Sequence, residues 1–127
     1  MSHQLVTIDE TVLERMRAVC LVLPEAYEDI AFGAPTFKIG AKHFAMLHLT
    51  QGRTSVWCKA ERGMQGVIVT SDPDRYFAPP YMGPKGWIAA WLDPEVDPDW
   101  DVVAEFALTS YRLIAPKRLV KLLDTDV

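Results

Sequence analysis

The chain has 127 residues, is half hydrophobic and about a quarter charged, and carries a net charge of −4. This size and balance predict one soluble globular domain over residues 1–127, and the acidic total argues against nucleic acid as a partner. The sequence holds no signal peptide and no apolar run long enough to span a membrane, so we expect a cytoplasmic protein with no membrane partner. Cys20 and Cys58 fit buried reduced thiols, and no spacing of cysteines and histidines predicts a zinc site or another cofactor.

The N-terminal part predicts a helix over residues 8–23. Thr7 and Glu10 form a capping box at its start, and Pro24 ends it because the residue before a proline disfavours the helical region. The residues that recur at helical spacing along it are Leu13, Met16, Cys20 and Leu23. A connector follows, in which residues 27–32 fit a short edge strand.

Residues 35–60 predict three consecutive strands joined by tight turns at Gly40-Ala41 and Gln51-Gly52. Glycine at the first central position suits a type II′ hairpin, and Gly52 can take a positive φ without steric cost. These turns fix the register, which places Phe37 opposite Phe44. By alternation, one face is then expected to carry Trp57 and Lys59 beside the two phenylalanines, and helices must cover both faces at least in part.

The second half predicts a poor helix, an ordered loop, a strand and two helices. The helix over residues 61–70 is poor because Gly63 and Gly66 each cost about 1 kcal/mol relative to alanine. Residues 75–86 contain three prolines, which restrict the backbone and predict an ordered loop. Residues 87–92 fit a strand, Asp97 fits the N-cap of the next helix, and Pro116 separates that helix from a last one ending near residue 123. The fold class is therefore α+β, in a single domain.

The charged and polar residues form no recognisable catalytic motif, neither a glycine-rich phosphate loop nor a nucleophile elbow. His43 and His48 lie five residues apart on one strand and point to opposite faces, so they cannot share a metal. Residues 33–87 carry a net charge of +4 and the flanks −8, which fits either a local anion-binding surface or solvated strand edges. Within this region Lys59 would bind an anion, pair with a carboxylate of the 72–74 turn, or extend its ammonium to water.

Six stretches together resemble the MmcQ/YjbR family, a domain of unknown function. They are LPEA at 23–26, FGAPTFKIG at 32–40, KHFA at 42–45, WCKA at 57–60, PPYMG at 79–83 with the following GW at 86–87, and SYRLIAPKRL at 110–119. The resemblance implies an antiparallel sheet with helices packed on it, in the order helix–three strands–helix–two strands–helix, of the secretion-chaperone-like type. The family is commonly labelled DNA-binding through structural similarity to a phage transcription factor, and it supplies no catalytic residue, so we expect no enzyme activity.

Three binding functions follow from these observations. The resemblance favours a non-catalytic DNA-binding protein whose cations, Arg53 among them, contact phosphates. The alternative is a small-molecule or peptide-binding module that holds an anionic group at Lys59 under the loop at 75–87. A third is an adaptor that binds a partner protein at a sheet edge. We expect a monomer or a weak homodimer, with candidate binding residues Lys38, Lys42, Trp57, Lys59, Arg75, Tyr81, Lys85 and Trp87.

Overall fold

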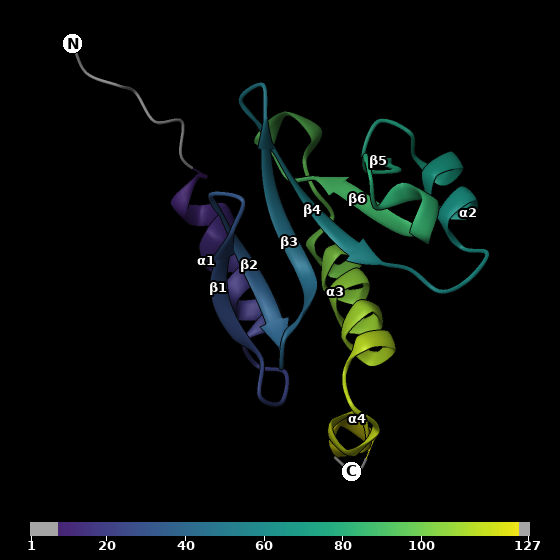
Figure 1. Cartoon of the computed structure of the whole chain (residues 1–127). Coiled ribbons are helices and arrows are strands. Elements are labelled where there is room, and N and C mark those ends of the chain that lie inside the picture. Colours follow the sequence, from purple (N-terminus) through teal and green to yellow (C-terminus); the bar gives the residue numbers. More distant parts are fainter. Residues whose placement is uncertain (1–7, 125–127) are drawn as a thin grey trace.

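The computed structural model describes residues 8–124, and its centre is a sheet of six antiparallel strands (Figure 1). The strands are β1 (Tyr27–Ala31), β2 (Ala34–Ile39), β3 (Lys42–Thr50), β4 (Arg53–Lys59), β5 (Tyr76–Phe77) and β6 (Trp87–Trp91). They lie side by side in the order β1-β2-β3-β4-β6-β5, so the last two strands in the chain, β5 and β6, lie on the β4 side of the meander.

Four helices and two 3-10 turns complete the domain. They are α1 (Glu10–Cys20), α2 (Gln65–Ser71), η1 (Gly83–Lys85), η2 (Pro94–Val96), α3 (Trp100–Ile114) and α4 (Lys117–Asp124). In Figure 1, α1 and α3 lie behind the sheet, whereas α2 flanks β5 and β6. This arrangement confirms the predicted α+β class, with β1 added to the expected order as the edge strand that residues 27–32 indicated.

Both predicted turns are confirmed. Gly40 has a φ of +60° between the paired residues Ile39 and Lys42, as the first position of a type II′ turn requires. Gln51 and Gly52 both have positive φ, which is the type I′ arrangement that matches the twist of the flanking strands. The β3–β4 register that follows from the second turn is also as predicted, with Met46 opposite Trp57.

The predicted pairing of Phe37 with Phe44 is wrong, because β3 contains a β-bulge. Phe37 lies opposite Ala45 and Lys38 lies opposite His43, so Phe44 is an extra residue on β3. The bulge keeps both Phe44 and Ala45 in the core behind the sheet, with Phe37. Trp57 lies in a different cluster, so the expectation that it shares a face with the two phenylalanines is also wrong.

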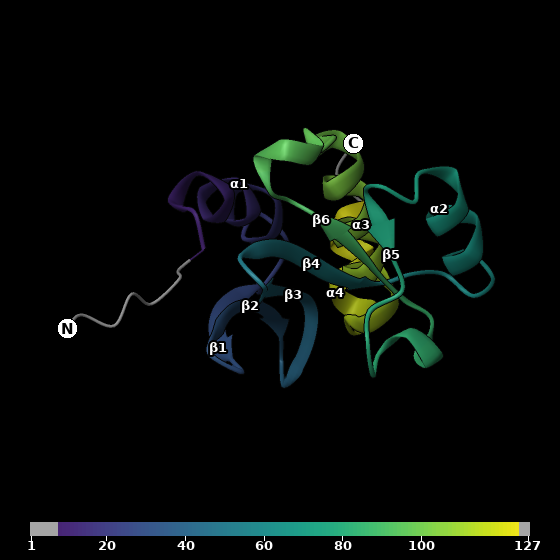
Figure 2. The ribbon, with the colours of Figure 1, turned by 90° about the horizontal axis from the view of Figure 1, so that it is seen from above.

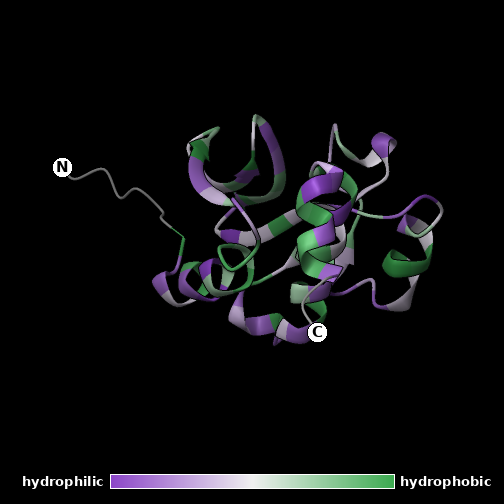
Figure 3. Cartoon of the chain, turned by 90° about the horizontal axis from the view of Figure 1, so that it is seen from below, coloured by the Kyte–Doolittle hydropathy of each residue, from purple (hydrophilic) through white to green (hydrophobic). Residues whose placement is uncertain are grey.

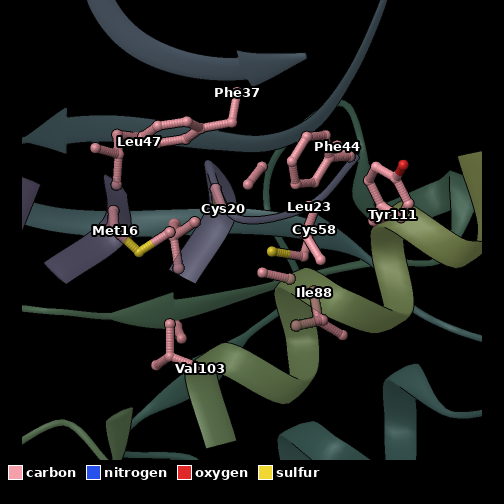
Figure 4. Close-up of a cluster of buried hydrophobic side chains, with 14 of the residues drawn as sticks. Met16, Cys20, Leu23, Phe37, Phe44, Leu47, Cys58, Ile88, Val103 and Tyr111 are labelled. Carbon is pink, nitrogen blue, oxygen red and sulfur yellow. The ribbon is translucent and has the colours of Figure 1, made fainter. Parts of the chain in front are cut away.

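The main core fills the space between the sheet and the helices α1 and α3 (Figure 4). Phe44 packs edge-on against the ring of Tyr111, with ring centroids 5.4 Å apart. The Tyr111 hydroxyl donates to the carbonyl oxygen of Pro24 at 2.6 Å, which ties α3 to the end of the α1 segment. Cys20 and Cys58 are buried free thiols in this core, as expected.

The other face of the sheet carries a second, smaller cluster made of Met46, Trp57, Trp87 and Ala89. No helix among residues 8–124 lies in front of this face in Figure 1. Figure 2 shows how the face is nevertheless closed, because β1, β2 and β3 curl away from the plane of β4 and β6 and make it concave. Curling brings neighbouring side chains together, and His48 stacks on Trp57 with ring centroids 3.5 Å apart.

The helix starts differ from those predicted. Asp9 caps α1, its carboxylate accepting from the backbone N–H of Thr11 at 2.7 Å, while Thr7 of the predicted capping box lies outside the described residues. Asp99, not Asp97, caps α3, because Asp97 has a φ of +50° and ends η2 instead. Asp9 and Asp99 cap their helices for the same reason, since a short acidic side chain accepts hydrogen bonds from backbone N–H groups that the first turn leaves free.

The edge strand β1 holds two carboxylates in ion pairs. Glu28 accepts from Arg17 of α1 at 2.7 Å, and Asp29 lies 3.4 Å from the ammonium of Lys38 on β2. These pairs fasten β1 to the layer behind it and to its neighbour, while the outer edge of β1 has no strand partner among the described residues.

The hydroxyl of Ser110 on α3 is fully buried and bonds to two strands at once. It donates to the carbonyl oxygen of Phe44 at 2.6 Å and accepts from the backbone N–H of Lys59 at 2.9 Å. The first bond satisfies a carbonyl at the bulge, and the second satisfies an N–H at the end of β4.

Replacing Ser110 with alanine should therefore lower the free energy of unfolding by about 2–4 kcal/mol, because two buried backbone groups lose their partner. Urea denaturation of the variant and the wild type measures the difference. Thr70→Ala is the matched control, since the Thr70 hydroxyl bonds to Gly66 on the exposed helix α2 and its loss should change stability by no more than about 0.5 kcal/mol. Equal stability of the two variants would contradict the structural role of Ser110.

Candidate anion-binding site

A cleft opens where β3 and β4 separate. Their ladder extends to the pair Ala45 and Cys58, and beyond it the Ser110 hydroxyl lies between Phe44 and Lys59. From this point β3 continues beside β2, whereas β4 continues beside β6 to the pair formed by Lys59 and Trp87. Figure 1 shows the two strands diverging, with α3 behind the gap.

Side chains from both strands, from the η1 segment and from the last turn of α3 line this cleft, which has a volume of about 390 Å³. The lining residues are Ala41, Lys42, His43, Lys59, Met82, Lys85, Trp87, Leu113 and Ile114. Three of these nine carry a positive charge and none is acidic, while the rest of the surface is largely apolar. A cleft of this kind attracts a small anion with an apolar part.

The three lysines of the cleft, Lys42, Lys59 and Lys85, make no ion pair within 4.0 Å to any residue in the part of the chain that the structure describes. Each comes from a different segment: the start of β3, the end of β4 and η1. Positive side chains gathered in one place without a counter-ion repel one another, and a bound anion relieves that repulsion.

The other cations predicted to bind phosphate are already engaged. Lys38 pairs with Asp29 at 3.4 Å, and Arg53 lies 3.3 Å from a carboxylate oxygen of Asp93. Arg75 donates to the carbonyl oxygens of Val96 at 3.0 Å and of Asp97 at 2.9 Å, besides its pair with Asp72. These three side chains are therefore engaged with other groups, and the structure does not bring them into the cleft.

The three aromatic residues predicted to bind a ligand differ in their burial and in whether they line the cleft. Trp57 is buried on the concave face, where its indole N–H donates to the Ser55 hydroxyl at 3.1 Å, and it does not line the cleft. Trp87 is also buried but contributes to the cleft wall. Tyr81 is 89% exposed, and its φ of +66° is a strained backbone for a residue other than glycine. It directly precedes Met82, which lines the cleft.

Sequence reasoning missed five of the nine residues that line the cleft, namely Ala41, His43, Met82, Leu113 and Ile114. Leu113 and Ile114 lie in the stretch at 110–119 that carried the family resemblance, which was the available signal. His43 lies on the cleft wall with its Nδ1 atom 3.2 Å from the Thr36 hydroxyl. Burial and the nearby Lys38 lower the pKa of His43, so its ring tends to stay neutral.

The remaining reactive groups do not point to chemistry at this site. Within residues 8–124, no three His, Cys, Asp or Glu side chains come together as a metal site. Burial raises the pKa of the Cys58 thiol to about 12 and also raises that of Cys20, which makes both poor nucleophiles near neutral pH. No helix in the described part of the chain is long and apolar enough to cross a membrane.

Comparison with known proteins locates the fold. A family model described as YjbR matches residues 21–113. A crystal structure of the Deinococcus radiodurans protein DR2400, with a DUF419 domain of the same family, superposes with a TM-score of 0.71 at 21% sequence identity, covering 88% of this chain and 87% of that chain. No curated protein matches the chain. At this identity the structural match supports the fold alone.

The concave face makes stability depend on pH through His48. Its Nε2 atom is buried and has no hydrogen-bond partner among the described residues, and burial lowers its pKa below 6.5. The unfolded chain therefore binds a proton at His48 more readily than the folded chain does. The contribution of the neutral ring to the free energy of unfolding is complete above about pH 6.5 and is lost as the pH falls toward the folded-state pKa.

His48→Phe should keep the stack on Trp57, raise stability at pH 7 by about 1 kcal/mol by removing the unpaired nitrogen, and weaken the pH dependence. Urea unfolding at pH 7 and at pH 5 measures both effects. His43, whose pKa is also lowered, should leave part of the dependence in place. An equally steep loss of stability in variant and wild type would show that His48 does not titrate in this range.

Proposed function

The chain belongs to the YjbR family, whose function is not established, and we propose that it is a non-catalytic binding protein that holds an anionic group between Lys42, Lys59 and Lys85. The observation that supports this most strongly is the division of the cations. Three of the predicted phosphate ligands are paired with carboxylates, whereas the other three share one cleft with no acidic lining. A phosphate or a carboxylate is the chemistry that such a cleft favours.

The size of the cleft favours a small ligand over a nucleic-acid duplex. About 390 Å³ is within the range of pockets that enclose small molecules. A duplex instead needs cations spread along its backbone, and here Lys38, Arg53 and Arg75 are engaged in ion pairs and hydrogen bonds. The family label of DNA binding therefore becomes the second candidate.

One observation favours that second candidate. Tyr81 exposes 89% of its surface beside a residue of the cleft wall, and an exposed aromatic ring next to cations is suited to stacking on a base while the cations bind phosphates. The cleft is also open to solvent at the molecular surface, so a single strand could place one phosphate in it.

Titration with inorganic phosphate and pyrophosphate by calorimetry tests the anion site. Lys59→Ala, Lys42→Ala and Lys85→Ala should each weaken binding about tenfold, because each removes a charge-assisted hydrogen bond. Lys121→Ala, which removes an exposed lysine on α4, is the matched control and should leave the affinity unchanged. Absence of anion binding in the wild type, or an equal effect of the control, would overturn the proposal.

Fluorescence anisotropy with a mixed DNA sequence at two salt concentrations separates the two candidates. If three lysines contact phosphates, the logarithm of the affinity should fall with the logarithm of salt concentration with a slope of about −2 to −3. Such a slope, reduced in the three cleft variants, would favour nucleic acid. Binding of phosphate without binding of DNA at low salt would favour the small ligand.

A further inference from the structure

A second cavity lies under α2, with a volume of about 220 Å³. Its lining residues are Lys59, Ala60, Glu61, Met64, Ile68, Ile88, Glu105, Phe106 and Thr109. None of the α2 residues is buried, and the helix starts after Met64 without a side-chain cap. Val67 of this helix is 56% exposed, and Figure 3 colours part of α2 as hydrophobic. The helix therefore packs only partly on the core, through Ile68, and leaves an apolar space beneath it.

This cavity and the lysine cleft both lie along α3, on either side of Ser110. Phe106 and Thr109 of α3 line the apolar cavity, and Leu113 and Ile114 line the cleft. Four residues of helix span about 6 Å, so the two linings are about one turn apart. Lys59 lines both spaces, and its backbone N–H bonds to Ser110, which lies between the two pairs of α3 residues.

From this placement we infer that the ligand is an amphiphilic anion, with its charged group in the lysine cleft and an apolar tail that passes Lys59 into the cavity under α2. The inference rests on the proposed function, because the cleft must hold the charged group. It extends that function by naming the ligand class: a monoanionic or dianionic head on a single hydrocarbon or aromatic tail.

The charges around the two spaces fix the orientation. Glu61 and Glu105 line the apolar cavity together with Lys59, whereas the cleft has three lysines and no acidic residue. A negative head group is repelled by the two glutamates and attracted to the cleft, so the tail occupies the cavity. An apolar cavity of about 150 Å³ accommodates benzene, and 220 Å³ therefore accommodates a tail of roughly six to eight carbons.

A series of straight-chain alkyl phosphates, from methyl to decyl phosphate, tests this directly by calorimetry. Affinity should rise about two- to fourfold for each methylene group that leaves water, and should level off once the cavity is full. The head group stays constant through the series, so the slope reports the tail alone.

Ile68→Trp fills the cavity and should remove the dependence on chain length, while methyl phosphate binds as before. Val67→Trp places the same side chain on the exposed side of α2 and is the matched control, which should keep the wild-type slope. Lys59→Met should lower the affinity for every member of the series by about the same factor, because it keeps the length of the side chain and removes the charge.

The outcomes separate this inference from the function on which it rests. Binding of methyl phosphate with no gain from longer chains overturns the amphiphilic ligand and leaves the anion site standing. A slope that persists in Ile68→Trp, with its fold verified by circular dichroism, also overturns the inference, because the tail then lies elsewhere. If no member of the series binds, the anion site fails and the inference fails with it.

Discussion

The buried hydroxyl of Ser110 is the interaction on which the site depends. It stands where the next pair of the β3–β4 ladder would form, bonded to Phe44 on one strand and to Lys59 on the other. Two strands that cannot pair must separate, and α3, which supplies the hydroxyl, also supplies the floor of the gap through Leu113 and Ile114. The cleft is therefore a product of how a helix packs on a bulged strand, and the backbone of one of its lysines, Lys59, is held by a hydrogen bond from its N–H to Ser110.

The same bulge distributes the apolar residues of the sheet. With Phe44 as the extra residue, Phe37 and Phe44 both join the core behind the sheet, and Met46 and Trp57 remain for the concave side. A sheet with two apolar faces needs cover on both, and here helices cover one while curling closes the other. The concave side is thus buried mainly by strands, with Met82 and Ile114 packed against its cluster, and the unpaired nitrogen of His48 lies within it.

Local signals in the sequence were sufficient for the turns and insufficient for the faces. Both turns need a positive φ, which most residues avoid and glycine adopts readily. The glycines at positions 40 and 52, which both have positive φ, were therefore a sufficient signal for the turns. Phe44 and Ala45 are both apolar, so alternation cannot reveal that one of them is inserted.

The lysines of the cleft were predicted as binding residues, but Arg53 could not be distinguished from them, because its partner Asp93 is 40 residues away and only the folded chain brings them together. Asp97 and Asp99 are equally good caps by type, and only the left-handed backbone of Asp97 separates them.

The carboxylates of β1 also bear on how readily the free edge of the sheet could pair with a second chain. An exposed strand edge is a template on which a second chain can add, and repeated addition leads to fibres. Glu28 and Asp29 alternate across the two sides of β1, and Arg17 and Lys38 hold them at this edge. An edge strand that carries charged side chains is less suited to such addition than an apolar one. The outer strand of this sheet thus carries paired charges next to the exposed Ile30 and Phe32.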